Sequence, residues 1–114
     1  MVNLGKEFWS GIQENIPIIA GQWTTSAKKI TLPPGKYILM GHATIPANTN
    51  SFGKIKLDVP IYENIQSWYP STDIVEINTT AFCTITTQRD IALIITSNVS
   101  MTLHTLEIAA LKIR

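Results

Sequence analysis

The chain offers few of the side chains from which reactive sites are built. Its 114 residues include one cysteine, two histidines and eight acidic residues. A single cysteine forms no internal disulfide, so no disulfide framework points to a small secreted scaffold. Cys83 lies between Phe82 and Thr84 in a strand-like segment, and we interpret it as a small buried apolar residue and not as a reactive thiol.

Charge is also scarce. Charged residues make up 15% of the chain, and the net charge is +1. Globular domains usually carry roughly one quarter of charged residues. Lys28 and Lys29 form the only adjacent basic pair, so the basic stripe of a phosphate-binding surface is absent from the sequence. We therefore expect no nucleic acid partner.

Long apolar runs are missing as well. The longest contains about five residues, whereas a membrane-spanning helix needs about 20. The first residues lack the basic start and the long apolar stretch of a signal peptide. We expect no membrane association, and we expect the chain to be made in the cytoplasm.

The motifs of enzymes and metal sites do not occur. His42 and His104 are the only histidines, and neither belongs to an HxH or HExxH pattern. Since a metal site normally needs three or four ligands, we interpret both as structural or interface residues, with a metal site as the alternative. No GxSxG sequence and no glycine-rich phosphate loop is found. We expect no catalytic residue, no metal and no cofactor. A hydrolase stays as a third alternative, because a pair of catalytic carboxylates is defined by geometry and not by sequence.

Apolar residues, in contrast, are plentiful, at 45% of the chain. With so few charges, either much of the surface is neutral Thr, Ser and Asn, or part of it is buried against another subunit. The clearest apolar run follows a turn at Pro33, Pro34 and Gly35, where proline presets φ for the early turn positions. Residues 37–40 are too few for a core helix and end at Gly41, so we predict a central strand buried on both faces.

Strict alternation marks residues 54–61. Alternate residues from Ile55 to Ile61 are apolar and the intervening ones are mostly polar, which predicts a half-exposed antiparallel strand. Pro60 has no N–H donor, so an edge position or the end of the strand is expected there.

Other segments complete an all-β pattern. The last predicted strand shifts its apolar parity twice, after Leu103 and before Leu111, which predicts β-bulges or burial on both faces. Eight to ten short strands with Gly, Pro and Asn between them predict one antiparallel β-sandwich of the jelly-roll type over residues 18–114. The further strands are predicted at 16–24, 30–32, 73–77, 81–86, 91–95 and 101–113, with loops at 46–53 and 63–72.

The turn and the strand after it also carry a resemblance. The segment TLPPGKY at residues 31–37, followed by an apolar strand, resembles an early hairpin of the jelly-roll domains of the complement globular-head and tumour-necrosis-factor type. Relatives of these domains occur in bacteriophage fibre, spike and capsid-decoration proteins. The resemblance runs from about Trp23 to Arg114 and includes no catalytic motif.

The resemblance implies a homotrimer whose final strand lies close to the trimer axis. It implies a non-enzymatic virion component of a bacteriophage, in a capsid-decoration, head-fibre or tail-tip role. The chain lacks the stalk that many relatives carry, which favours a compact unit fixed by its N-terminal arm. The expected trimer interface consists of residues from the central and final strands: Tyr37, Leu39, His104, Leu106, Leu111 and Ile113.

Residues 1–17 are predicted to form that arm. Phe8, Ile12 and Ile16 recur at a spacing of four beside Trp9, which fits a short amphipathic helix. Two glycines oppose a helix, and a following proline would end it. Either the segment packs along the domain, or its apolar residues anchor the protein to other virion proteins.

Loop aromatics are the candidates for ligand binding. Trp68 and Tyr69 lie in one predicted loop, and Asn48, Asn50 and Phe52 lie in the other. Aromatic side chains provide a large contact area to a sugar or a protein at a low entropy cost. The alternative is that these rings lie on the domain or against a neighbouring subunit. The rival function is therefore a carbohydrate- or receptor-binding module, with a host-surface glycan as its partner.

Overall fold

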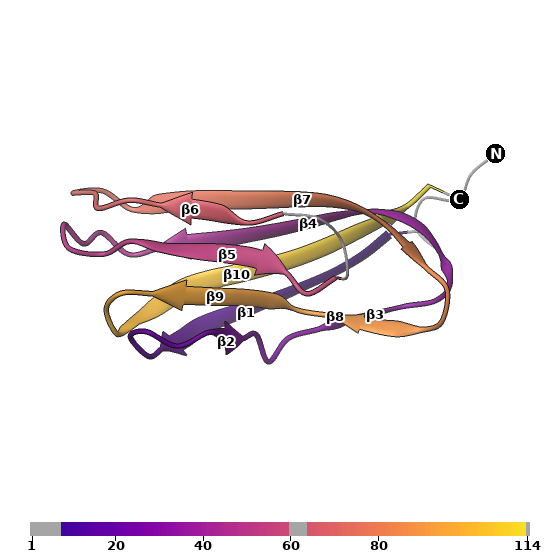
Figure 1. The fold of residues 1–114 in the computed structure, drawn as a ribbon, viewed down its shortest axis with the longest axis horizontal. Coiled ribbons are helices and arrows are strands. Elements are labelled where there is room, and N and C mark those ends of the chain that lie inside the picture. Colours follow the sequence, from indigo (N-terminus) through magenta and orange to yellow (C-terminus); the bar gives the residue numbers. More distant parts are fainter. Residues whose placement is uncertain (1–7, 60–63, 114) are drawn as a thin grey trace.

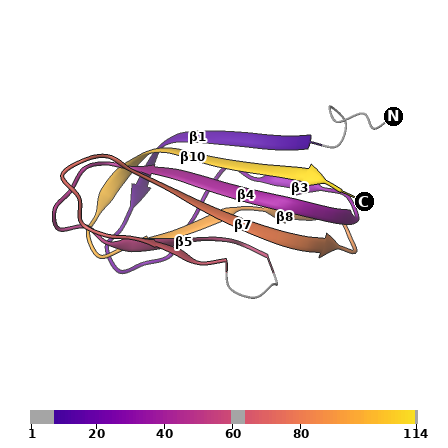
Figure 2. The same ribbon diagram turned by 90° about the horizontal axis from the view of Figure 1, so that it is seen from above.

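The protein is an antiparallel β-sandwich. The structure, a computed structural model, describes residues 8–59 and 64–113, and within these residues it contains ten strands and no helix. Two four-stranded sheets pack face to face, and a third, two-stranded sheet lies at one end (Figures 1 and 2). Every strand pair is antiparallel. The predicted fold class is confirmed.

The first sheet is made of the longest strands. Its spatial order is β1 (Phe8–Ile18), β10 (Met101–Lys112), β4 (Gly35–Ile45) and β7 (Val75–Ile85). The second sheet has the order β2 (Thr24–Thr25), β9 (Leu93–Ser97), β5 (Gly53–Leu57) and β6 (Gln66–Trp68). The third sheet pairs β3 (Ile30–Leu32) with β8 (Arg89–Ile91). Because the chain crosses repeatedly between the facing sheets, strands that follow one another mostly lie in different sheets, as in a jelly roll.

The core fills the space between the two large sheets. Tyr37 and Leu39 of β4 point into it, and the Tyr37 hydroxyl donates a hydrogen bond to the Pro33 carbonyl at 2.6 Å. The Trp9 ring meets Tyr37 edge to face, with 5.6 Å between the ring centroids. Within the described residues, no buried side-chain nitrogen or oxygen lacks a hydrogen-bond partner. The polar side chains buried among the described residues therefore all have their hydrogen bonds satisfied within the chain.

The predicted turn and central strand are present, but only one face of that strand is buried. Pro33 and Pro34 separate β3 from β4, and β4 pairs with β10 on one side and β7 on the other. Burial alternates along β4: Leu39 has no exposed surface, whereas Met40 is exposed. The prediction of burial on both faces is therefore wrong for the single chain.

Residues 8–18 form a strand of the first sheet. β1 pairs with β10 from Phe8 to Ile18, so the helical interpretation is wrong and residues 8–17 belong to the sandwich. The spacing of four between apolar residues suggested a helix, but it arises from a break in the strand at Asn15, which has a positive φ of 54°. This residue changes the side to which the strand presents its apolar residues, so Phe8 and Ile12 are exposed while Ile16 is buried. Residues 1–7 of the predicted arm lie outside the described residues.

Three other predicted segments differ from the structure. The two strands expected at 73–77 and 81–86 are one continuous strand, β7, in which the hydroxyl of buried Thr79 donates to the Asn64 carbonyl. The predicted loop 63–72 contains β6. β5 pairs with both β6 and β9, so it is an interior strand, while the alternation that predicted it is confirmed by the burial of Ile55 and Leu57. Residues 60–63, with Pro60, lie outside the described residues.

The final strand shows one of its two predicted parity shifts. Leu103 and Leu106 are both buried although they are three positions apart, an odd spacing that puts residues of a regular strand on opposite faces, so the shift at this point is confirmed. This parity shift of β10 lies opposite Asn15 of β1. In both strands the residues that face the core therefore switch parity at the same level of the sheet. The second shift is wrong, because Ile108 and Ala110 continue the buried series and Leu111 points outward.

Candidate functional site

The outer face of the first sheet is the side turned away from the second sheet. Residues that pair directly across neighbouring strands share a side of the sheet, so the strand register assigns this face row by row. One row crosses all four strands and consists of apolar side chains only. We call it the apolar row: Phe8, Leu111, Ile38 and Phe82.

Among residues 8–59 and 64–113, no segment covers the apolar row. Phe82 is 69% exposed and Phe8 is 47% exposed, while Ile38 and Leu111 between them are half-buried. The row lies at the end of the sandwich where β1 begins and β10 ends (Figure 2). An apolar band that reaches from one edge of a sheet to the other is typical of an interaction surface.

Polarity rises along the outer face with distance from the apolar row. The next row contains Met40 flanked by small residues. The third row pairs Ile12 and Glu107 with His42 and Asn78, and the fourth ends in Glu14 and Glu76. The full second row is Ser10, Ala109, Met40 and Thr80. The full fourth row is Glu14, Thr105, Thr44 and Glu76.

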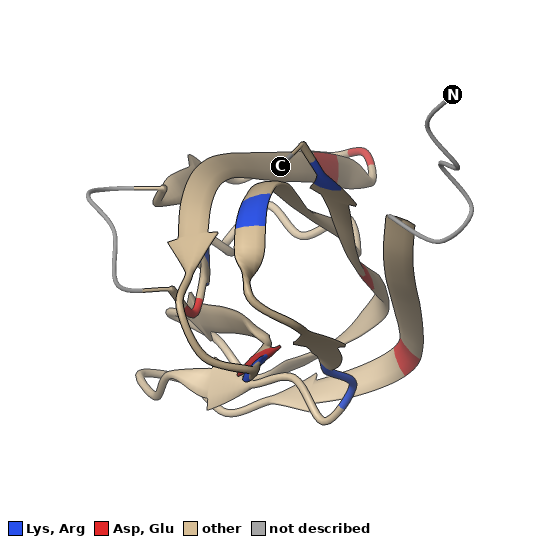
Figure 3. Ribbon diagram, turned by 90° about the vertical axis from the view of Figure 1, so that its right-hand side faces the viewer, with Lys and Arg blue, Asp and Glu red and all other residues tan. Residues whose placement is uncertain are grey.

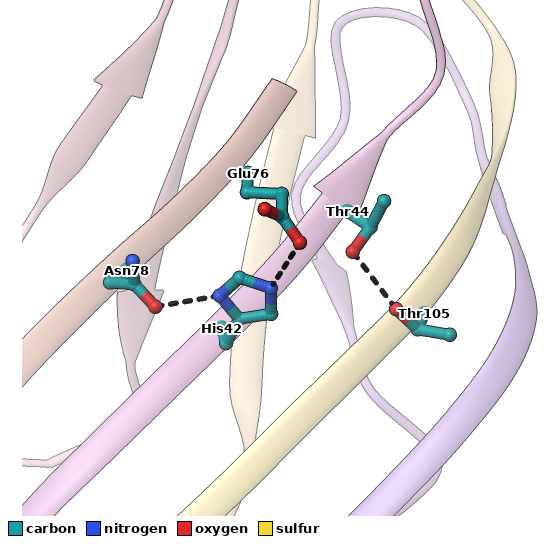
Figure 4. A network of polar contacts seen from close by, with 5 residues as sticks. All are labelled: His42, Thr44, Glu76, Asn78 and Thr105. Atoms are coloured by element: carbon teal, nitrogen blue, oxygen red, sulfur yellow. Dashed lines mark hydrogen bonds and ion pairs between the residues drawn. The ribbon is translucent and has the colours of Figure 1, made fainter. Parts of the chain in front are cut away.

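The polar rows contain a hydrogen-bonded network (Figure 4). His42 donates from Nδ1 to Asn78 Oδ1 at 2.6 Å, which leaves Nε2 facing Glu76 Oε1 at 3.6 Å. Thr105 Oγ1 donates to Thr44 Oγ1 at 3.1 Å. A shallow hollow of about 430 Å³ lies between this network and Met40. Its one imidazole and its carboxylates do not form a metal centre: among residues 8–59 and 64–113, no three His, Cys, Asp or Glu side chains are grouped to hold an ion.

Only part of the predicted trimer interface lies on the outer face. Tyr37, Leu39 and Leu106 are buried in the core of the single chain, so their assignment to an interface between subunits is wrong. Their apolar character serves the sandwich itself. Leu111 belongs to the apolar row, Ile113 is exposed beyond it, and His104 is exposed at the parity shift of β10.

The sequence interpretation missed Phe82 and Ile38. The signal was present in β7, where every second residue from Val75 to Ile85 faces the core and Phe82 has the opposite parity. Because that segment was divided into two short strands, the parity was not followed through. Of the predicted anchoring residues, Phe8 and Ile12 point outward, while Trp9 and Ile16 pack toward the core, so the four do not share a face.

A second surface lies at the opposite end of the molecule, on the second sheet, where β6 and β9 end and β5 begins (Figure 1). Tyr69 is 74% exposed and Phe52 is 53% exposed, and both line a cleft of about 360 Å³. Lys54, Ser67 and Asn98 also line it. We call this the loop cleft.

Trp68 is a core residue and not a surface contact. Its side chain is 2% exposed, and its Nε1–H donates to Ser51 Oγ at 3.0 Å. Asn48 and Asn50 organise the neighbouring loop: Asn48 Oδ1 accepts from the Asn50 backbone N–H at 2.8 Å, and neither side chain lines the loop cleft. Of the five predicted ligand-binding residues, the structure brings Phe52 and Tyr69 together in one cleft.

Cys83 is buried, and burial raises the pKa of its thiol, an effect that the charge of Arg89 partly offsets. A thiol that stays protonated is a poor nucleophile. The structure thus supports the interpretation of Cys83 as a small core residue.

Charged residues elsewhere are few, and basic and acidic positions are interspersed along the chain (Figure 3). In the part of the chain that the structure describes, no helix is long and apolar enough to cross a membrane.

No family model matches this chain, and no curated protein sequence matches it.

Proposed function

We propose that the protein is a non-enzymatic structural protein that self-associates through the outer face of the first sheet. The observation that carries the proposal is the apolar row, in which Phe8, Leu111, Ile38 and Phe82 cross the whole sheet without cover from any other described segment. Complete removal of a large apolar side chain from water contributes about 1.5–3 kcal/mol. Burial of the exposed parts of these four side chains therefore favours association, against the entropy cost of bringing the subunits together.

A second copy of the chain is the partner that fits this surface best. The chain carries few charges, and the apolar row reaches both sheet edges, β1 and β7. Copies arranged about an axis parallel to the strands place apolar rows beside apolar rows and polar rows beside polar rows. The polarity gradient along the face favours this parallel arrangement over an antiparallel one.

The number of subunits and the biological setting rest on the sequence resemblance. The resemblance of segment 31–37 and the strand after it to trimeric jelly-roll domains supports a homotrimer and a place in a bacteriophage virion, as a capsid-decoration, head-fibre or tail-tip protein. The position of Leu111 from β10 in the apolar row is compatible with a final strand close to the trimer axis. Exposed Phe8 and Ile12 on the edge strand β1 remain candidates for contact with other virion proteins.

The test is the solution mass of the full chain, measured by light scattering with size-exclusion chromatography. We expect a mass near three chains, and we expect Phe82→Asp to reduce it to one. Phe52→Asp is the matched control, because Phe52 is an exposed phenylalanine in the loop directly before β5 of the other sheet. Circular dichroism would confirm that both variants fold. A monomeric wild-type chain, or equal behaviour of the two variants, would refute the proposal.

The rival function, a monomeric carbohydrate- or receptor-binding module, has support from a separate observation, the exposed Phe52 and Tyr69 in the loop cleft. A monomeric mass together with glycan binding would make that function the principal one.

A further inference from the structure

The loop cleft continues the register of the second sheet into the loops around it. Lys54 pairs with Ser67 on one side and Thr96 on the other, so these three polar side chains form a row on the outer face of that sheet. Two residues further along each strand, Phe52, Tyr69 and Asn98 follow with the same parity. The cleft thus has a polar row followed by an aromatic row, both open to solvent.

Hydrogen bonds to Asn98 hold the loop that carries Phe52 in place. Asn98 Oδ1 accepts a hydrogen bond from the Phe52 backbone N–H, and Asn98 Nδ2 donates to the Asn50 carbonyl, both at 2.8 Å. The Asn98 backbone N–H also donates to the Phe52 carbonyl at 3.1 Å. Since loop ordering is a main cost of ligand binding, a loop fixed in this way is prepared for a ligand.

Gly53 lets the buried Trp68 ring pack directly beneath the strand that lines the cleft. A Cβ atom at Gly53 would point toward the core and collide with the Trp68 ring and the Thr96 carbonyl oxygen. The buried indole of Trp68 therefore lies directly under the backbone of Gly53 and supports it.

The polar row has unused binding capacity. Within the described residues, the side chains of Lys54, Ser67 and Thr96 form no hydrogen bond or ion pair, and no acidic residue lines the cleft. Lys56, the next lysine on the same face, is engaged differently, with its ammonium 4.8 Å from the centroid of the Trp23 ring. Lys54 is thus the free cation of this part of the described surface, beside two hydroxyl groups.

We propose that the loop cleft binds a saccharide that carries a carboxylate. The C–H face of a pyranose ring stacks on the rings of Tyr69 and Phe52, as apolar faces do on exposed aromatic side chains. The sugar hydroxyls bond to Ser67 and Thr96, and the carboxylate pairs with the Lys54 ammonium. This combination of an apolar face with a rim of polar groups and one charge is what a uronic or sialic acid presents. The site does not depend on self-association, because it lies on the other sheet.

The experiment is a binding assay with the full chain on a panel of immobilised oligosaccharides, half of which carry uronic or sialic acids and half of which are neutral. We expect binding to acidic members of the panel. Tyr69→Ala and Phe52→Ala are expected to weaken it about tenfold or more, a size typical of a lost stacking contact. Lys54→Gln is expected to lower the affinity for acidic saccharides about tenfold and to leave the affinity for any neutral saccharide unchanged.

Phe82→Ala serves as the control, since it removes an exposed aromatic ring from the first sheet. It is expected to leave saccharide binding unchanged, and thermal melting would confirm that every variant is folded. Three results would overturn the proposal: no saccharide binds, Tyr69→Ala binds as well as the wild-type chain, or neutral saccharides bind as tightly as acidic ones. None of these results bears on the mass measurement that tests self-association.

Discussion

At the scale of single residues, several polar side chains hold the sandwich together from inside. Thr79 is buried in β7, and its hydroxyl donates to the backbone carbonyl of Asn64, which precedes β6. Thr80, its neighbour, has the opposite parity and is exposed. The two threonines therefore provide a matched pair for measuring what one buried hydrogen bond contributes.

Thr79→Val is expected to lower the free energy of unfolding by about 1–3 kcal/mol, because the shape is kept while the Asn64 carbonyl loses its partner. Thr80→Val should change it by less than about 0.5 kcal/mol. Urea unfolding followed by tryptophan fluorescence would measure both values. Equal values for the two variants would show that the hydrogen bond is not important for stability.

Two buried ionisable groups predict that the fold weakens in alkali. Burial raises the pKa of the Tyr37 phenol above its usual 10.0 and that of the Cys83 thiol above its usual 9.0. The unfolded chain thus loses these protons first as the pH rises, so the stability present below pH 9 is lost as the pH passes the folded-state values. Urea midpoints at pH 7, 9 and 10 should fall in this order. Tyr37→Phe should flatten the change, and an unchanged slope in that variant would assign the effect to other groups.

At the scale of elements, the sequence predicted those strands whose character is local. The turn at Pro33 and Pro34 and the alternation around Ile55 lead to β4 and β5 because proline and period-two patterns act over a few residues. β1 and β7 could not be predicted in the same way. In β7 the polar residues at the centre resemble a turn, and only Asn64, distant in the sequence, provides the partner for Thr79.

For the candidate sites too, features set by local sequence could be predicted, and features set by distant contacts could not. The exposed aromatics Phe52 and Tyr69 were recognised from their loops, whereas Trp68 was assigned to the surface because its partner, Ser51, lies in a different loop. The apolar row was missed in part, since a row across four strands depends on the register of β1, β10, β4 and β7 and not on any one segment.

The change of side within β1 depends on one residue, Asn15, with its positive φ of 54°. Asn15→Gly is expected to leave the free energy of unfolding unchanged or slightly raised, because glycine adopts this conformation without strain. Asn15→Ala should lower it by about 1–2 kcal/mol, since Cβ opposes the left-handed region. Thermal unfolding of both variants would measure the difference. If alanine is as stable as glycine, the strand can change sides without a left-handed residue.

At the scale of the whole molecule, the two large sheets present different surfaces to solvent. The first sheet carries an apolar row at one end of the sandwich, and the second carries the loop cleft at the other. Self-association through one and ligand binding at the other do not compete for surface. A single chain can therefore hold both functions, and an assembly multiplies the number of clefts.

The apolar row predicts that both of its ends matter for assembly. Phe8→Asp, at the β1 edge, is expected to lower the solution mass of the full chain as Phe82→Asp does at the β7 edge, because each places a charge in the same apolar band. Ile19→Asp is the control, an exposed apolar residue in the turn after β1. Light scattering at several concentrations would measure this. A normal mass for Phe8→Asp would restrict the contact to the β4 and β7 half of the sheet.

The pairing of β1 with β10 has a consequence for the time at which the protein folds. Among the described strands β10 is the one partner of β1, so β1 stays unpaired on the ribosome until residues 101–112 have been synthesised and have emerged from the exit tunnel. During that interval Phe8, Ile16 and Ile18 have no sheet to join. Completion of the first sheet is consequently a late event, and we expect it to be slow, as in other proteins dominated by contacts distant in the sequence.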